Sequence, residues 1–189
     1  MEIVLASGSA RKREIMEKSG IPFRVEVPEV DESFFDNLPA QKKVEEIARA
    51  KAIKAAEKFP QDLIIASASL SKLSDKIVLG KPKDLKRALK MAMKHSAKQT
   101  TCYTAVCLIH PQQGEFMEMV ETKFKFQPFT RVELKPLVDE QFLQRAGALG
   151  ITEETSGYTL VESISGSYSG AFGLPMEIVR KYLKKWELI

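Results

Sequence analysis

The chain has 189 residues, of which 44% are hydrophobic and 29% are charged, values close to the average for a globular domain. A chain of this length can bury about 70% of its unfolded surface, so it needs neither a metal nor a disulfide to fold. The 29 Lys and Arg residues exceed the 25 Asp and Glu residues by only four. This small excess argues against a nucleic-acid groove and favours a protein that tolerates anionic ligands.

The sequence also argues against membrane insertion and export. No apolar run approaches the ~18 residues that a membrane span needs, and the start of the chain lacks the basic region and long apolar stretch of a signal peptide. Cys102 and Cys107 are the two cysteines, and their odd spacing puts them on opposite faces of an apparent strand. We therefore expect no local disulfide, no zinc site, no membrane partner and a cytoplasmic location.

In the first third of the chain, short apolar runs alternate with patterns of helical spacing. The predicted elements are a strand at 2–6, a helix at 11–18 with Ser9 as its N-cap, an extended segment at 23–27, a helix at 40–58 and a strand at 62–66. Gly20 and Pro60 follow the two helices and are typical of helix ends.

The rest of the chain continues the alternation and adds a hairpin. The predicted elements are a helix at 85–92, strands at 101–109 and 116–126 joined by a turn at 111–114, a helix at 134–142, a strand at 158–164 and a helix at 175–186. Lys123 and Lys125 alternate with Phe124 and Phe126, which is typical of a half-exposed strand. The pattern predicts an α/β domain around a mixed, twisted sheet with flanking helices.

A polar motif, Ser7-Gly-Ser-Ala-Arg-Lys12, lies between the first predicted strand and the first predicted helix. The free N–H groups and the positive dipole end of a helix favour an anion there. The Ser7 and Ser9 hydroxyls can donate to phosphate oxygens, and Arg11 and Lys12 supply positive charge. A bound phosphate would explain basic residues in a first turn, which oppose the dipole by about 0.3–1 kcal/mol each. The alternative is a capped helix with a solvated basic first turn.

Three further motifs can carry chemistry or be ordinary surface. Lys81 stands in a tight turn ahead of a helix, where a lysine is usually exposed. Three acids within residues 29–32, ending at Glu32, can hold Mg²⁺, a hard cation that prefers oxygen ligands, or can simply face solvent. The Gly/Ser-rich segment 163–174 can follow a ligand's phosphates or ribose, or can merely make a turn. His95 and His110 have no nearby partner in the sequence, so neither is assigned a role.

Taken together and in order, the motifs resemble those of one family. The segments are Leu5-Ala-Ser-Gly-Ser-Ala-Arg-Lys12, Asp31-Glu32, Ala50-Lys-Ala52, Leu79-Gly-Lys-Pro82, Thr104-Ala-Val106, Thr122-Lys-Phe-Lys-Phe126, Ala146-Gly-Ala-Leu-Gly-Ile151 and Gly173-Leu-Pro175. The chain resembles the Maf (septum-formation) family of nucleoside triphosphate pyrophosphatases from end to end. The opening serines, the Gly-Lys-Pro turn and the closing Gly-Leu-Pro are the most specific parts.

The resemblance implies a single domain over residues 1–189, with the elongated, two-lobed fold that the family shares with inosine triphosphatase-type enzymes. It implies a central mixed sheet and a nucleotide cleft between the lobes. The implied reaction converts a non-cognate, modified or pyrimidine nucleoside triphosphate and water into the monophosphate and pyrophosphate. The implied cofactor is Mg²⁺ or Mn²⁺, and a homodimer is possible because family members often dimerise.

Residue by residue, the resemblance implies two kinds of ligand. The phosphate-binding positions are Ser7, Ser9, Arg11, Lys12, Lys51 and Lys81, and the metal-associated glutamate is Glu32. In the first of these motifs, Ala10 replaces the family's usual proline and Lys12 replaces its second arginine. The residues that hold a triphosphate are therefore present.

The residues that the family uses to act on a triphosphate are changed. Ser69 stands where the family usually has an Asp that serves as base or metal ligand. Gln144-Arg145 replaces the family's Asp-Lys, and the resemblance implies that both residues bind the substrate. Thr152 replaces a later glutamine. A serine hydroxyl stays protonated at neutral pH and cannot take a proton from water. Losing a positioned general base typically costs ~10²–10⁴-fold in rate.

Three interpretations follow from these departures. The chain is a divergent pyrophosphatase of reduced activity in which Asp62, Asp75 or Asp84 substitutes for the missing acid. Alternatively, it binds nucleotides as a sensor or interaction partner without turnover. A third interpretation is a globular protein that merely keeps the fold.

Overall fold

The computed structural model describes residues 1–74, 77–144, 146–148 and 160–189. Its α-helices are α1 (Ala10–Lys18), α2 (Ala40–Lys58), α3 (Leu85–Ala92), α4 (Arg131–Leu134), α5 (Tyr168–Ala171) and α6 (Met176–Lys185). Its 3-10 helices are η1 (Glu32–Phe35), η2 (Met93–His95), η3 (Lys135–Leu137), η4 (Glu140–Gln144) and η5 (Ala146–Ala148). Its strands are β1 (Ile3–Ala6), β2 (Arg24–Glu26), β3 (Leu63–Ser74), β4 (Ile77–Leu79), β5 (Gln99–His110), β6 (Gly114–Phe126) and β7 (Val161–Gly166).

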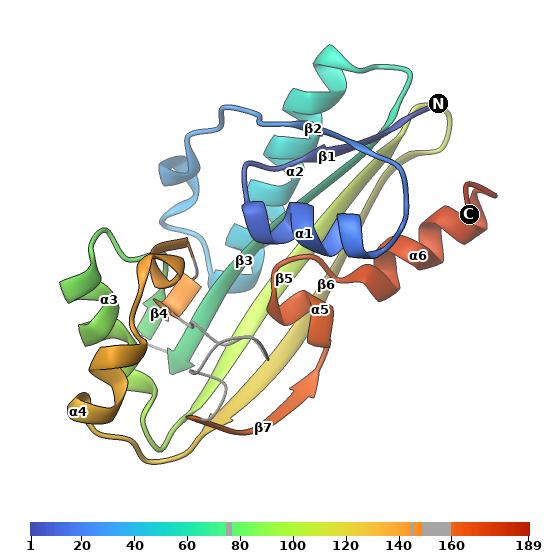
Figure 1. Cartoon of the computed structure of the whole chain (residues 1–189). Helices are drawn as coiled ribbons and strands as arrows, with labels where there is room; N and C mark the ends of the chain where they lie inside the picture. Colours follow the sequence, from blue (N-terminus) through green and yellow to red (C-terminus); the bar gives the residue numbers. More distant parts are fainter. Residues whose placement is uncertain (75–76, 145, 149–159) are drawn as a thin grey trace. The chain divides into compact units, whose positions relative to one another are not determined.

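The seven strands found among the described residues form one mixed sheet. Their order is β2-β1-β3-β5-β6-β7, with β4 paired to β3. β1 lies parallel to β2 and to β3, whereas β4 is antiparallel to β3 and β7 is antiparallel to β6. The predicted α/β fold with a mixed sheet flanked by helices is confirmed (Figure 1).

The chain divides into two compact units. The first contains residues 1–69, 103–120 and 167–189, and the second contains residues 70–102 and 121–166. Strands β3, β5 and β6 each continue along the chain from one unit into the other. The nucleotide cleft between two lobes stays a prediction.

The core of the first unit follows from the alternation of side chains along its strands. Ile3, Leu5, Leu63 and Ile65 point to one face of the sheet because residues two apart share a face. They belong to a buried cluster with residues of α1, β5 and α6, among them Met16, Val106, Leu108, Ile178, Val179 and Leu183. Helix α2 packs on the opposite face through its buried residues Val44, Ile47, Ala48, Ala52 and Ala55 (Figure 1).

In the second unit, two short strands pair antiparallel with the ends of long strands, β4 with β3 and β7 with β6. Ser71 of β3 is the register partner of Leu79 of β4, and Phe124 of β6 is the partner of Ile164 of β7. Helix α3 buries one face, formed by Ala88, Leu89 and Ala92. This unit therefore carries the turn between β4 and α3 that contains Lys81.

Two predictions from the sequence differ from the structure. The helix predicted at 134–142 is wrong, because a capping box of Thr130 and Glu133 begins α4 at Arg131 and Pro136, which has no N–H to donate, follows one turn later. The strand predicted at 62–66 extends to Ser74 as β3, and β4 was not predicted. β3 is buried on both faces over most of its length, and its second half carries serines in place of a continuous apolar run, so the pattern gave no signal for the extension.

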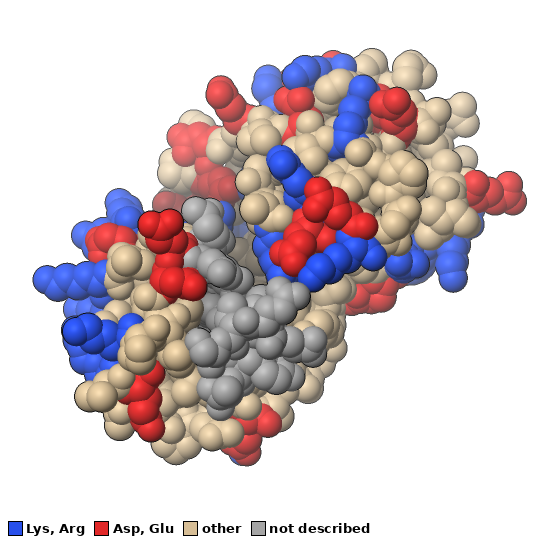
Figure 2. Space-filling model, in the orientation of Figure 1, with Lys and Arg blue, Asp and Glu red and all other residues tan. Residues whose placement is uncertain are grey.

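Charges on the surface are mixed in sign. On the face shown in Figure 2, Lys and Arg side chains are interspersed with Asp and Glu side chains. Helical neighbours pair, as Arg11 does with Glu14 and Lys42 with Glu46, an arrangement that stabilises a helix by a few tenths of a kcal/mol. Within the described residues, no helix has both the length and the apolar character to cross a membrane.

His95 is a buried titratable group of the second unit, with 1% of its surface exposed. Burial lowers the pKa of His95 from 6.5 to about 4, the hydrogen bond to Gly147 opposes this shift, and Lys98 and Lys94 add to it. The imidazole is therefore neutral in the folded protein at pH 7.

We predict that His95 makes the fold less stable in acid. As the pH falls from about 7 towards 4, the unfolded chain gains a proton on His95 that the folded chain does not accept. The free energy of unfolding should therefore fall by about 2 to 3 kcal/mol by pH 4.5 from this residue. Urea denaturation of wild type and of His95→Gln at pH 7 and at pH 4.5 measures this decrease. The variant has no imidazole at position 95, so its free energy of unfolding should fall less between the two pH values. Equal pH dependence in the two proteins contradicts the prediction.

Candidate functional site

The register between two parallel strands brings two serine motifs together in the first unit. Leu5 of β1 is the partner of Ile65 of β3. Each is followed two and four residues later by serines, Ser7 and Ser9 after Leu5, and Ser67 and Ser69 after Ile65. β1 ends at Ala6, so Ser7 and Ser9 lie past its carboxyl end, whereas β3 continues to Ser74 and contains Ser67 and Ser69. The parallel register therefore sets the turn after β1 beside the middle of β3. In open α/β sheets, ligands bind outside the carboxyl ends of strands such as β1.

The chain turns sharply between β1 and α1. The Ser7 N–H donates to the Leu5 carbonyl at 3.0 Å, and the buried Ser7 hydroxyl oxygen accepts from the Ser9 N–H at 3.2 Å. Ser9 occupies the N-cap position, as predicted, but its side chain makes no capping hydrogen bond. The Ser7 hydroxyl satisfies one backbone donor just ahead of the helix.

Lys12 ties α1 to β3. Its ammonium group donates to the Ser67 carbonyl at 2.6 Å and is buried there. The Ser67 hydroxyl donates in turn to the Gly173 carbonyl at 2.8 Å. Gly173 has a φ of 99°, and a Cβ atom on it would lie 3.0 Å from Cε of Lys12, so glycine suits both the backbone and the close approach.

Arg11 lies beside Lys12 and contacts the same loop. Its guanidinium carbon lies 5.0 Å from the centre of the Phe172 ring, which is within cation–π range. It also donates to Glu14 at 2.8 Å. The aromatic ring and the carboxylate hold the charge of Arg11 near the first turn of α1, the place where the sequence predicts a phosphate.

Ser69 belongs to a short hydrogen-bonded chain. Oγ1 of Thr104 lies 2.8 Å from Oγ of Ser69 and 2.8 Å from the Gly170 carbonyl oxygen. The carbonyl can only accept, so the single Thr104 proton goes to Gly170 and the Ser69 hydroxyl donates to Thr104. The Ser69 hydroxyl proton is therefore used in a hydrogen bond within the protein, and Ser69 has no carboxylate that could accept a proton from water.

The loop that supplies Gly170, Phe172 and Gly173 is anchored at its base. The Ser169 hydroxyl donates to Glu177 at 2.7 Å and accepts from the Met176 N–H at 2.8 Å. Burial raises the pKa of Glu177, but hydrogen bonds from Ser167 and Ser169 outweigh it, so the pKa lies below its usual value. Glu177 is therefore ionised near neutral pH and holds the loop against α6.

The predicted metal-associated glutamate and one predicted phosphate ligand pair with each other. Lys51 of α2 donates to Glu32 of η1 at 2.5 Å, and about half of the Glu32 side chain is exposed. The neighbouring Asp31 accepts from the N–H and the hydroxyl of Ser33, and these bonds lower its pKa. Exposed ion pairs contribute about 0–1 kcal/mol, so a ligand can separate Glu32 from Lys51 at little cost.

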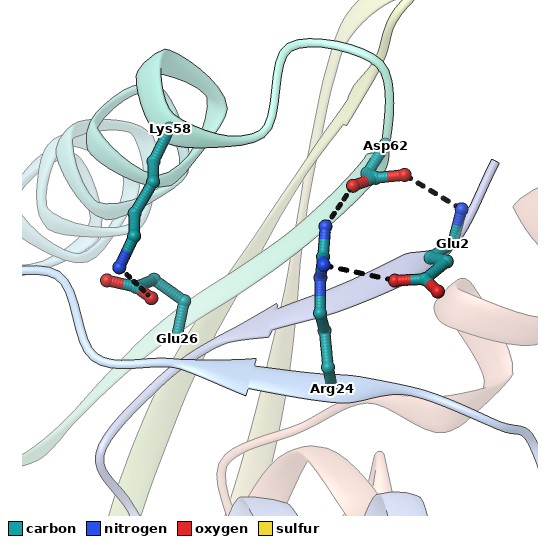
Figure 3. A network of polar contacts seen from close by, with 5 residues as sticks. All are labelled: Glu2, Arg24, Glu26, Lys58 and Asp62. Atoms are coloured by element: carbon teal, nitrogen blue, oxygen red, sulfur yellow. Dashed lines mark hydrogen bonds and ion pairs between the residues drawn. The ribbon is translucent and has the colours of Figure 1, made fainter.

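The acids considered as substitutes for the missing base have other partners. Asp62 accepts from the Glu2 N–H and pairs with Arg24 (Figure 3). It precedes Ser69 by seven residues along β3, or about 23 Å at 3.3 Å per residue. Asp84 caps α3 by accepting from the Arg87 N–H. Asp75 lies outside the described residues.

Lys81 and Gln144, two more of the predicted ligands, belong to the second unit. Lys81 is exposed in the turn after β4. Gln144 ends η4, and its side chain, like Arg145 and Thr152, lies outside what the structure describes. Whether these residues share a ligand with Ser7, Ser9 and Arg11 therefore stays a prediction.

No group of three or more His, Cys, Asp or Glu side chains suited to a metal occurs among the described residues. Mg²⁺ is commonly held by one or two carboxylates together with substrate phosphates and water. A single carboxylate such as Glu32 fits that kind of site. The described residues hold no cluster that could bind a metal with protein ligands only.

Comparison with known proteins identifies the family. A family model described as Maf-like protein matches residues 2–186. The chain belongs to the Maf-like protein family. It is 34% identical to the dTTP/UTP pyrophosphatase of Carboxydothermus hydrogenoformans, with 98% of this chain and 99% of the relative aligned. It is 33% identical to the dTTP/UTP pyrophosphatase of Acetivibrio thermocellus, with 97% and 94% aligned.

A solved nucleoside-triphosphatase / dITP/XTP pyrophosphatase from Mycobacterium abscessus aligns with 67% of this chain and 74% of that one. The TM-score is 0.36 and the identity is 18%, which is too low to carry an argument. The family assignment therefore depends on the match along the sequence.

Sequence reasoning missed Ser67, Thr104 and Phe172 as parts of this site. A signal for Ser67 was present, because Leu5-Ala-Ser-Gly-Ser9 and Ile65-Ala-Ser-Ala-Ser69 share a pattern and follow two apolar runs. Thr104 stands in one of the motifs that carry the family resemblance, but nothing local shows its role, and nothing local distinguishes Phe172. Both roles arise from contacts with residues far away in the sequence.

We predict that Ser67→Ala destabilises the first unit. The buried Gly173 carbonyl loses its hydroxyl donor, which typically costs about 1–3 kcal/mol. The hydrogen bond from the Lys12 ammonium group to the main-chain carbonyl of residue 67 remains. Urea denaturation measures the loss, with the half-exposed Ser69→Ala as the matched control, for which we expect a smaller change. A Ser67→Ala protein as stable as wild type contradicts this description of the loop contact.

Proposed function

We propose that this chain is a nucleoside triphosphate pyrophosphatase that acts on pyrimidine nucleotides of the dTTP and UTP kind, with slow turnover. The proposal rests on family membership and on full-length relatives named dTTP/UTP pyrophosphatase. The binding part of the proposal is supported by the pairing of β1 with β3, which sets the Ser7–Ser9 turn and the start of α1 beside the Ser67–Ser69 segment of β3.

In the proposed reaction, water attacks the α-phosphorus and the bond from that phosphorus to the bridging oxygen breaks. Pyrophosphate leaves, and the proton of the attacking water must go to an acceptor. The N-terminus of α1 and the charge of Arg11 favour the polyanion, and the hydroxyls of Ser7 and Ser9 can donate to its oxygens.

Slow turnover is proposed because Ser69 cannot accept the proton. Its hydroxyl is uncharged at neutral pH and already donates to Thr104 within the hydrogen-bonded chain to Gly170. Asp62 is about 23 Å away along the strand. With no base at this position, we expect a rate about 10²–10⁴-fold below that of an enzyme with a carboxylate there.

The proposed cofactor is Mg²⁺ or Mn²⁺ carried by the triphosphate. When bound, the metal would neutralise charge on the phosphate oxygens. Glu32 is the carboxylate that we expect to approach it, and Lys51, released from Glu32, would turn to a phosphate. A cytoplasmic location and a homodimer remain predictions on which none of these steps depends.

A second candidate function is nucleotide binding without turnover, as in a sensor. The hydrogen-bonded chain from Ser69 through Thr104 to Gly170 favours it, because the position of the expected base is used to hold a loop. Release of pyrophosphate distinguishes the two functions, since both predict that nucleotide binds.

Ser69→Asp should restore a base. We expect it to raise the rate of pyrophosphate release from UTP by about 10²–10⁴-fold, while the affinity for UTP measured by calorimetry changes little. Ser74→Asp is the matched control, since it makes the same substitution at the exposed end of the same strand and should leave the rate unchanged. A folded Ser69→Asp protein with no gain in rate contradicts the role given to this position.

Arg11→Ala should weaken nucleotide binding. Removing one charge-assisted contact of about 1.5–3 kcal/mol should lower the affinity for UTP with Mg²⁺ by at least about tenfold. Arg13→Ala, an exposed arginine two residues along the same helix, should bind as wild type does. Titration calorimetry with both variants decides the matter, and equal affinities would place Arg11 outside the site.

A further inference from the structure

Gly147 joins two segments of the second unit through its own peptide groups. Its N–H donates to the Gly80 carbonyl at 2.9 Å, and its carbonyl accepts from Nε2 of His95 at 2.8 Å. In Figure 1 the orange turns that precede the uncertain segment lie beside β4 and α3. The residue after Gly80 is Lys81, one of the predicted phosphate ligands.

Only glycine suits this junction. Gly147 has a φ of 74°, in the left-handed region that side chains rarely adopt. A Cβ atom there would lie 2.9 Å from Cβ of Ser71 and 3.4 Å from Nε2 of His95. The close contact with β3 on one side and His95 on the other fixes where the Gly147 peptide groups point.

His95 is held in one tautomer. Because the Gly147 carbonyl can only accept, Nε2 carries the proton, and Nδ1 accepts from the buried Thr100 hydroxyl at 2.6 Å. The ring also packs on Phe126, with 5.3 Å between ring centres. Both nitrogens and one ring face are therefore engaged, and the ring presents a fixed donor to Gly147.

The turn that carries Lys81 is anchored on both sides of that residue. Gly80 is bound by Gly147 on one side, and the buried Pro82 has a fixed φ on the other. Asp84 then caps α3 by accepting from the Arg87 N–H at 2.7 Å. The Lys81 side chain is exposed, so the position of its backbone is set by the contacts of Gly80 and Pro82 on either side of it.

We infer that His95 is a positioning residue that acts through Gly147 to hold the turn at 80–84 in the shape that presents Lys81 to phosphate groups. The inference rests on the proposed function for its ligand, a nucleoside triphosphate. It concerns the backbone of the turn and gives His95 no contact with the ligand.

The first test needs no nucleotide. Amide hydrogen exchange at Gly147, followed by NMR in the full chain, reports the bond to Gly80. His95→Leu should accelerate exchange by about tenfold or more, because the Gly147 carbonyl loses the imidazole N–H that holds this residue in place. His95→Gln, whose amide can still donate to the Gly147 carbonyl, should recover much of the protection. Leu134→Val, which trims the core of the same unit without removing a hydrogen bond, should leave this amide unchanged relative to other core amides.

The second test asks whether the effect passes through Lys81. His95→Leu and Lys81→Ala should each weaken binding of UTP with Mg²⁺ by about fivefold to tenfold, and the double variant should be no weaker than Lys81→Ala alone. Such non-additivity is expected of residues that act as one unit.

The outcomes separate this inference from the proposed function. Unchanged exchange at Gly147 in folded His95→Leu, or losses of affinity that add in the double variant, overturns the inference. A wild-type protein that binds no UTP overturns the proposed function, while accelerated exchange in His95→Leu still supports the connection from His95 to the turn.

Discussion

The pairing of β1 with β3 is the constraint on which the candidate site depends. Once Leu5 is set beside Ile65, the turn at Ser7 that follows β1 lies beside Ser67 within β3. The start of α1 and the loop before α6 then meet through the contacts of Lys12 with Ser67 and of Ser67 with Gly173. This register places Ile3, Leu5, Leu63 and Ile65 together in one buried cluster, and a shift of one residue would turn the side chains of the shifted strand to the other face.

The same packing separates holding an anion from acting on it. Serine hydroxyls, a helix N-terminus and an arginine can hold phosphate without any proton transfer, and all are present in the first unit. Proton transfer needs an acceptor near the reacting atoms, most often an imidazole or a carboxylate. At Ser69 the chain has instead a hydroxyl that joins β3 to β5 and to the loop at Gly170, so the position contributes to packing. Binding of a nucleotide and its turnover are therefore separable properties of this chain.

Much of the fold could be predicted from the sequence because strong patterns govern it locally. The helical spacing of Val44 and Ile47 places α2, and the apolar run before Ser7 places β1. The helix expected at 134–142 failed because its apolar positions span Pro136, where backbone chemistry overrides the pattern. The candidate ligands near α1 were predictable from a local motif. The contact of Phe172 with Arg11 was not, because it joins residues that tertiary packing alone brings together.

A crystal structure with Mg²⁺ and a UTP analogue whose α–β bridging oxygen is replaced by a methylene group tests the central claim most directly. The account predicts that the triphosphate lies against the first turn of α1, touching Ser7, Ser9 and Arg11, with Ser69 facing the α-phosphate. A triphosphate bound elsewhere on the chain, with those side chains in the contacts described above and untouched, would contradict it.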